Sequence, residues 1–108
     1  MTNENRVRDM AKAFTPALAA LVDEPLFSDI WDRKGLSQRD RSLVTVAALV
    51  VMYRPAELGA HLKRALSNGV SKDELSEVIT HLAFYGGFPA AISASVLAAD
   101  TLGGLDVA

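Results

Sequence analysis

The residues best placed to do chemistry are Glu57 and His61, an acid and an imidazole four positions apart. On a helix this spacing puts both side chains on the same side, one turn apart, with Cβ atoms roughly 5–6 Å from each other. A carboxylate beside an imidazole can orient the ring, raise its pKa and make it a general acid or base near neutral pH. The plainer alternative is a solvated helical pair that stabilises the helix by about 0.2–0.5 kcal/mol. The spacing alone leaves both interpretations open.

A helix is predicted to carry this pair. Pro55 suits a first helical position, and Asn68-Gly69 is typical of a helix end. Apolar residues recur between them at intervals of three and four, which indicates one apolar stripe: Leu58, Leu62, Ala65 and Leu66. Glu57 and His61 border or enter this stripe, where a polar group is costly unless it is paired or used.

The second histidine, His81, follows Glu77 by four residues on a later predicted helix. It flanks an apolar face, and we expect it at the surface or at a subunit contact. No H-E-x-x-H pattern is present, and His61 and His81 lie on different predicted helices, so no metal site is expected. The chain has no cysteine and no G-x-S-x-G motif, so neither a thiolate nor a serine elbow is predicted.

Helical periodicity and capping signals cover most of the 108 residues, and no segment alternates like a half-buried strand. We predict one all-α domain, residues 1–108, of five or six helices. The first expected elements are a helix over 5–22 bent at Pro16 and a short helix over 26–33. A helix over 43–53 is expected to follow an N-cap at Ser37 and to be buried nearly all round. After the helix from Pro55, we expect a helix that the Ser71 capping box opens and Gly86-Gly87 breaks, and a last helix over 90–102.

Composition limits the possible partners. Half of the chain is apolar, which is a large share for so small a domain, and this favours burial of some of it against another subunit. The net charge is −2 without a strong basic cluster, so nucleic acid is not an expected partner. No apolar run is long enough to span a membrane and the first residues do not read as a signal peptide, so a cytoplasmic location is expected.

Several fixed motifs occur in order along the chain. Residues 31–43 match W-x-R-x-G-L-x-x-R-x-R-x-L, residues 57–61 match E-L-x-x-H, and residues 65–69 match A-L-x-N-G. Glu77-Val78 and the later A-x-Y-x-G-x-P-A-A run over 83–91 complete the pattern, which extends over about residues 26–103. With these motifs the chain resembles the carboxymuconolactone decarboxylase family. The resemblance implies an alkylhydroperoxidase D-like helical subunit that assembles into a homo-oligomer, commonly a trimer or hexamer.

The resemblance also bears on the chemistry. Thiol peroxidases of the wider superfamily use a C-x-x-C pair, and the matching positions here are Arg54 and Glu57, so that activity is excluded by the absence of cysteine. The cysteine-free branch implies decarboxylation of a small carboxylated lactone in aromatic acid breakdown. Such a substrate delocalises its own electron pair, so no cofactor is implied.

In this branch His61 would donate the proton and Glu57 would orient it. Arg41 or Arg54 would bind a carboxylate of a small anionic substrate, and Tyr85 would line the pocket. This chain carries Ile92-Ser93 where those decarboxylases often carry an asparagine, which implies a different substrate if that group touches it. The alternatives are another reaction on a related acid or lactone, and a non-catalytic oligomeric or ligand-binding protein.

Overall fold

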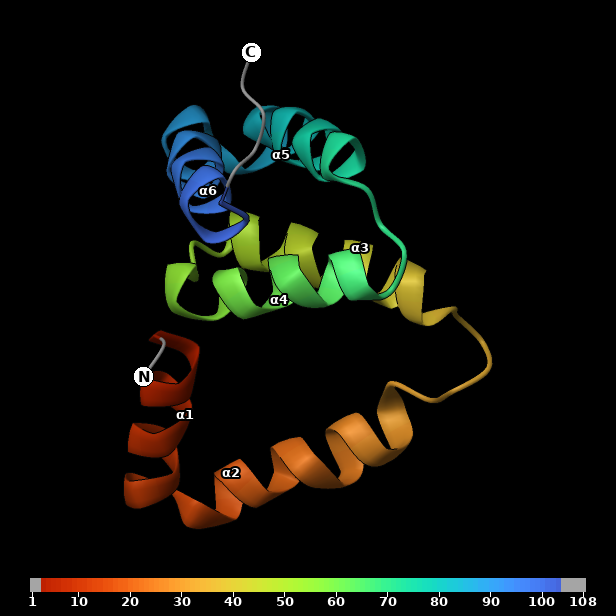
Figure 1. Cartoon of the computed structure of the whole chain (residues 1–108), viewed down its shortest axis with the longest axis vertical. Helices are drawn as coiled ribbons and strands as arrows, with labels where there is room; N and C mark the ends of the chain where they lie inside the picture. The colour runs from red at the N-terminus through yellow and green to blue at the C-terminus, as the bar shows by residue number, and fades with distance from the viewer. Residues whose placement is uncertain (1–2, 104–108) are drawn as a thin grey trace.

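A computed structural model describes the backbone of residues 3–103 and the side chains of residues 6–103. Within these residues the chain forms helices and no strand, as predicted (Figure 1). The helices are α1 (Asn3–Phe14), α2 (Pro16–Leu21), the π-helical segment η1 (Val22–Ile30), α3 (Gln38–Val51), α4 (Pro55–Ser67), α5 (Lys72–Gly86) and α6 (Phe88–Thr101).

The starts of three helices follow the signals in the sequence. Ser37 caps α3, since its hydroxyl accepts a hydrogen bond from the Asp40 amide at 3.0 Å. Ser71 and Glu74 form the predicted capping box at α5, with each side chain accepting from the other's backbone amide at 3.0 and 2.9 Å. Pro55 occupies the first turn of α4.

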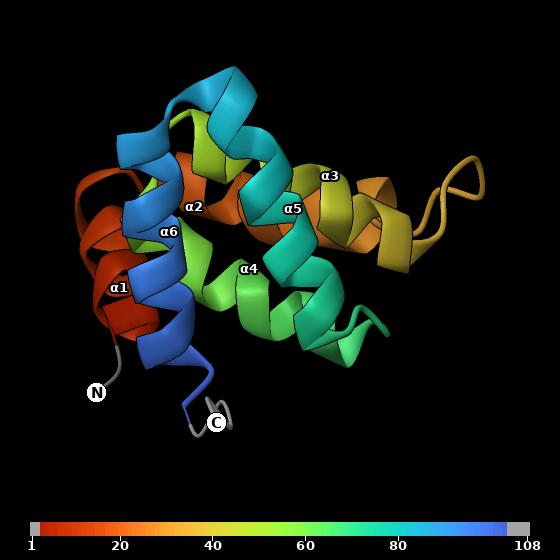
Figure 2. The same ribbon diagram turned by 90° about the horizontal axis from the view of Figure 1, so that it is seen from above.

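The core lies between two helical layers. Helices α3 and α4 form a central pair, and α5 and α6 lie side by side across one side of it (Figures 1 and 2). Alanines on α6 let its backbone approach the pair closely. The buried apolar residues are Val46, Val50, Leu58, Leu62, Ala65, Val70, Leu75, Ile79, Ala83, Ala91, Ala94 and Ala98.

Gly86 lies at a close contact between α5 and α3. A Cβ atom placed there would lie 2.7 Å from Cγ1 of Val51 and 3.1 Å from the Val51 Cα. The next residue, Gly87, has a φ of +100°, which a residue with a side chain rarely adopts. The predicted break at Gly86-Gly87 is confirmed. Gly86 permits the close contact with Val51, and Gly87 permits the positive φ.

Gly86→Ala is therefore expected to lower the free energy of unfolding by about 1–3 kcal/mol, because the Val51 backbone cannot move aside freely. Gly35→Ala is the matched control, since a Cβ there meets nothing within 4 Å. Urea denaturation followed by circular dichroism measures both changes. Equal stability of the two variants would contradict the close approach.

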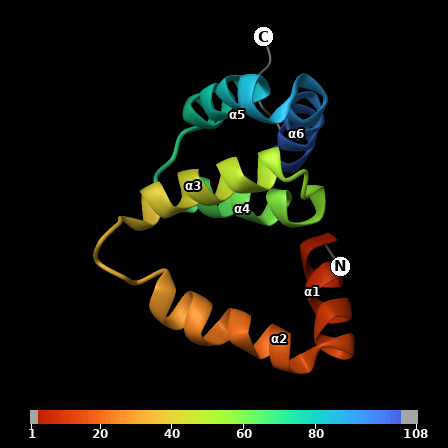
Figure 3. The same cartoon turned by 180° about the vertical axis from the view of Figure 1, so that it is seen from behind.

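The first three helical segments form an arm, residues 3–30, on the side of the α3–α4 pair opposite to α5 and α6 (Figures 1 and 3). The predicted single helix over 5–22 is in fact divided at Thr15, whose φ of −130° and ψ of 70° are not helical. Proline disfavours the helical conformation of the residue before it and lacks an amide donor, so Pro16 begins a new helix. The short second helix, predicted over 26–33, follows a kink at Glu24 and ends at Ile30.

One expectation about burial is wrong within a single subunit. The segment over 43–53 was expected to be buried nearly all round, yet only one side of α3 faces the core. Val46 and Val50 are buried, whereas Val44 is 60% exposed. In the part of the chain that is described, none of the helices is both long and apolar enough to cross a membrane.

Candidate functional site at the arm and helix α4

Helix α4 presents two adjacent stripes. Leu58, Leu62 and Ala65 face the core and are buried. Glu57, His61 and Arg64 follow one another at intervals of four and three residues, so they lie along the neighbouring side of the helix. Of these, Glu57 and Arg64 are exposed and His61 is half-buried, so the predicted pair borders the apolar face with only its imidazole partly covered.

Aromatic side chains from the end of the arm cover His61. The buried Trp31 ring stacks on the imidazole with ring centroids 6.1 Å apart and an interplanar angle of 23°. Phe27 lies next to Trp31, with centroids 5.7 Å apart. The Arg64 guanidinium carbon lies 4.2 Å from the Phe27 centroid and 5.5 Å from that of Trp31. We call Phe27, Trp31, His61 and Arg64 the arm–α4 cluster.

Side chains of α3 hold the turn that positions Trp31. Gln38 donates through Nε2 to the Asp32 carboxylate at 2.9 Å and lies 3.5 Å from the Trp31 carbonyl oxygen. Arg41 donates through Nη2 to the Arg33 carbonyl at 3.0 Å, and its Nε is buried without a partner. Arg41 was predicted to bind substrate, and in this subunit it makes a structural contact with the Arg33 carbonyl.

The environment of His61 favours its neutral form. Burial, followed by the positive charge of Arg64, lowers the pKa of the imidazole below its ordinary value. Its Nδ1 is buried and has no hydrogen-bond partner among the described residues. Leaving a buried polar atom unpaired is costly, so a hydrogen-bond partner for this nitrogen is expected from outside the described residues.

Glu57 and His61 share one side of α4, but no hydrogen bond or ion pair joins them in the described part of the subunit. Glu57 is free of the cluster's rings and remains exposed to solvent.

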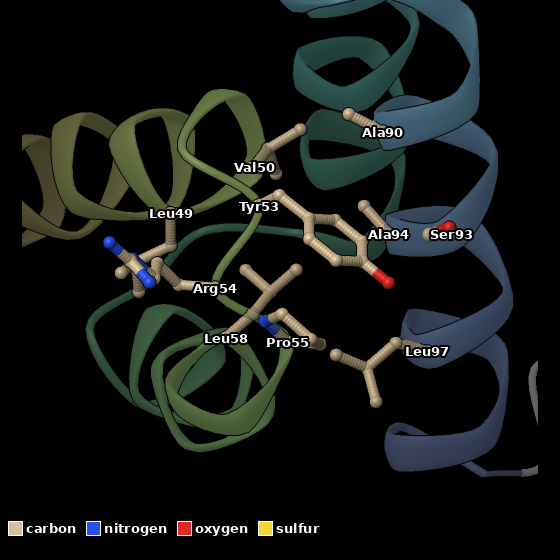
Figure 4. Close-up of a pocket in the computed structure, with 10 residues that line it drawn as sticks. All are labelled: Leu49, Val50, Tyr53, Arg54, Pro55, Leu58, Ala90, Ser93, Ala94 and Leu97. Atoms are coloured by element: carbon tan, nitrogen blue, oxygen red, sulfur yellow. The ribbon is translucent and has the colours of Figure 1, made fainter.

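Arg54 lies at the other end of α4, where it precedes the first turn. It borders a small hollow between the end of α3, the start of α4 and α6, with a volume of about 10 Å³. In Figure 4 the Tyr53 ring extends toward α6 and Ser93, while Arg54 lies on the other side, near Leu49. This hollow has room for about one water molecule and does not include His61.

Tyr85 and His81 lie together on α5, with ring centroids 5.0 Å apart, and both are exposed. His81 borders a groove between α3 and α5 with a volume of about 360 Å³, lined by Leu43, Ala47, Glu77, Val78, His81 and Leu82. Tyr85 is thus a neighbour of His81 and does not belong to the arm–α4 cluster.

The other arginine of the entry segment is also engaged. Arg39 forms ion pairs with Glu74 and Asp40. A hydrogen bond from the Ser71 backbone, followed by the contact with Arg39, lowers the pKa of Glu74 below its ordinary value. Among residues 6–103, no three histidine, aspartate or glutamate side chains gather as a metal site would require.

The structure thus brings Trp31, Phe27 and Arg64 to His61, and sequence reasoning named none of them as site residues. Two signals were available: Trp31 opens the first matched motif, and Arg64 lies three residues after His61, on its side of the helix.

A family model and several known proteins match this chain. The model of the carboxymuconolactone decarboxylase family matches residues 16–101, which includes η1 and the whole arm–α4 cluster. The chain belongs to this family. Its members in the comparison include 4-carboxymuconolactone decarboxylase of Acinetobacter baylyi, 36% identical over 104 residues that make up 96% of this chain and 78% of that protein.

Two further relatives match most of this chain. Nitrosuccinic acid decarboxylase of Metarhizium robertsii is 34% identical over 99 residues, covering 92% of this chain and 68% of that protein. An uncharacterized 15.0 kDa protein of Paracoccus denitrificans is 32% identical over 100 residues, covering 77% of this chain and 75% of that protein. Two of these three relatives are named as decarboxylases.

Proposed function

We propose that this family member is a decarboxylase of a small carboxylic acid that carries its own electron acceptor, and that His61 handles the proton. The observation that carries the proposal is the half-buried His61 with an unpartnered ring nitrogen, stacked on Trp31 and beside Arg64, in a chain whose relatives include two decarboxylases.

The two named activities share a chemical principle. A lactone carbonyl in one substrate and a nitro group in the other can accept the electron pair that remains when CO₂ leaves. We infer the same class of substrate for this chain. Such a substrate is a small anionic acid with an acceptor group in conjugation with the bond that breaks. Because the acceptor belongs to the substrate, this reaction does not require an added cofactor.

The step balances as follows. The bond between carbon and the carboxylate breaks, CO₂ departs, and its bonding pair moves into the acceptor group. A proton then adds to carbon and the acceptor is restored, so that one proton is consumed for each CO₂ released. The protein's tasks are to hold the carboxylates, to exclude water and to deliver that proton.

In the proposed division of roles, His61 delivers the proton through Nε2 and Glu57 stabilises the imidazolium from one turn away. Since the free enzyme favours neutral His61, the ring takes up a proton when the anionic substrate arrives, because a nearby negative charge raises the pKa of an imidazole. Arg41, Arg54 and Tyr85 remain candidate substrate ligands, from this subunit or across a subunit contact.

The test is an assay of CO₂ release from 4-carboxymuconolactone and from nitrosuccinic acid with the purified chain. The proposal predicts turnover of at least one of them well above the buffer rate. No release from either acid would overturn it and would favour the alternative, a non-catalytic oligomeric or ligand-binding member of the family.

We also propose that the chain acts as a homo-oligomer, with the trimer or hexamer of the family resemblance as the expected form. The support is a large exposed apolar surface on α5 and α6, formed by Phe84, Tyr85, Phe88, Ile92 and Val96. Its three aromatic rings alone expose on the order of 400 Å², against about 800 Å² per partner in a typical stable interface. The arm adds further exposed apolar side chains, among them Phe14 at 90% exposure.

Light scattering coupled to size-exclusion chromatography measures the assembly. We expect several subunits per particle in the natural chain and dissociation on Phe84→Glu, because a charge in a desolvated interface is strongly unfavourable. Lys72→Glu, at the exposed start of the same helix, is the matched control and should leave the assembly unchanged. A monomeric natural chain would contradict the oligomer. A cytoplasmic location, where small organic acids are metabolised, completes the proposal.

A further inference from the structure

The arm–α4 cluster contains an arginine, Arg64, that the sequence did not predict as a substrate ligand. Arg64 is exposed, lies over the faces of two aromatic rings and stands three residues beyond His61. No carboxylate pairs with it in residues 6–103. A guanidinium has five donors in a fixed plane, and stacking on rings leaves the edge of that plane open to a ligand.

The other candidate arginines are less suited to this task. Arg41 is bound to the Arg33 carbonyl, and Arg39 is paired with Glu74. Arg54 borders a hollow two helical turns away from His61. Arg64 is the candidate whose charge reaches the imidazole, as its effect on the pKa of His61 indicates.

We propose that Arg64 is the anchor for a carboxylate of the substrate, with its guanidinium held over Phe27 and Trp31 so that the bound anion lies beside His61. This inference rests on the proposed function and names the residue that selects its acidic substrates. Bidentate binding of a carboxylate by a guanidinium is both strong and directional, so it would fix the register of the substrate relative to Nε2 of His61.

The same geometry couples binding to protonation. Glu57 and Arg64 lie within about one turn of His61 on its own helix, and α1, which packs against α4, carries Arg6, Arg8, Asp9 and Lys12. Of these, Arg64 is the one whose charge lowers the pKa of His61. A carboxylate bound to Arg64 offsets that charge, so binding raises the pKa of the imidazole. The imidazole then takes up the proton that the reaction consumes.

The experiment uses succinate as an unreactive dicarboxylate probe and follows the histidine ring signals by NMR. The chain has two histidines, so His61→Gln and His81→Gln assign both signals, and His81 serves as an internal reference. Saturating succinate is expected to raise the pKa of His61 and leave that of His81 unchanged. Arg64→Gln is expected to raise the pKa of free His61 toward its ordinary value and to weaken succinate binding about 10–100-fold.

Arg64→Lys separates charge from geometry. Lysine keeps the positive charge, so the pKa of His61 is expected to stay low. Lysine lacks the planar guanidinium group, so the affinity for succinate is expected to lie between those of the natural chain and Arg64→Gln. Lys72→Gln is the control for loss of one exposed positive charge and should leave both quantities unchanged. Unchanged succinate binding in Arg64→Gln, or an equal loss only in Arg54→Gln, would overturn the proposal.

These measurements are independent of turnover. Succinate binding that requires Arg64 in a chain that releases no CO₂ would defeat the proposed function and leave the anchor in place. If CO₂ release proceeds and Arg64→Gln leaves KM unchanged, the proposed function stands and the anchor is wrong.

Discussion

His61→Gln is expected to lower kcat for decarboxylation by about 10²–10⁴-fold, the usual contribution of a positioned general acid. Glutamine keeps a polar amide of similar reach but cannot exchange a proton near neutral pH. His61 is half-buried and its Nδ1 has no hydrogen-bond partner among residues 6–103, so the substitution breaks no hydrogen bond at that nitrogen. Stability and assembly should therefore change little while turnover is lost.

His81→Gln is the matched control for this substitution. His81 is the other histidine of the chain, is exposed on α5 and lies outside the arm–α4 cluster. Steady-state kinetics, urea denaturation and light scattering on both variants separate a chemical role from a structural one. A kcat of His61→Gln within threefold of the natural chain would remove His61 from the mechanism.

Trp31→Ala is expected to lower the free energy of unfolding by about 3–5 kcal/mol. Trp31 is buried, contacts Phe27 and His61, and links the end of the arm to α4. Its loss removes a large apolar contact and leaves the hydrogen bonds from Gln38 and Arg41 to hold the turn alone. Denaturation followed by circular dichroism measures the change, and Trp31→Phe should lose less because it keeps one ring.

Lys34→Ala, an exposed change close to the same turn, is the control and should alter stability by no more than about 0.5 kcal/mol. Trp31 is also the single tryptophan of the chain, so its fluorescence in the natural protein reports on docking of the arm. Stability of Trp31→Ala equal to that of Lys34→Ala would show that the arm contributes little to the fold.

Local signals in the sequence predicted most of the helices. Ser37, Ser71 and Pro55 mark helix starts through interactions with residues at most three or four positions away, and such interactions can be read from the chain directly. The break at Thr15 was harder to place, because a proline can bend a helix or end it, and the choice depends on how the arm packs.

The candidate site was predicted only in part. His61 was found from its spacing and from the family motif, but its neighbours Trp31 and Phe27 come from a segment about 30 residues earlier. Such a contact depends on the tertiary path of the arm, which local periodicity does not specify. For the same reason the sequence named Arg41 and Arg54 as candidate substrate ligands and did not name Arg64, whose charge lowers the pKa of the His61 imidazole.

The most direct measurement of the central claim is the source of the proton in the product. Decarboxylation of 4-carboxymuconolactone by the natural chain in D₂O, analysed by NMR of the product, reports where and on which face deuterium enters. If His61 delivers the proton within a closed site, one deuterium enters on a single face, and His61→Gln loses both the rate and this selectivity. Deuterium on both faces, at a rate that His61→Gln leaves unchanged, would contradict the account.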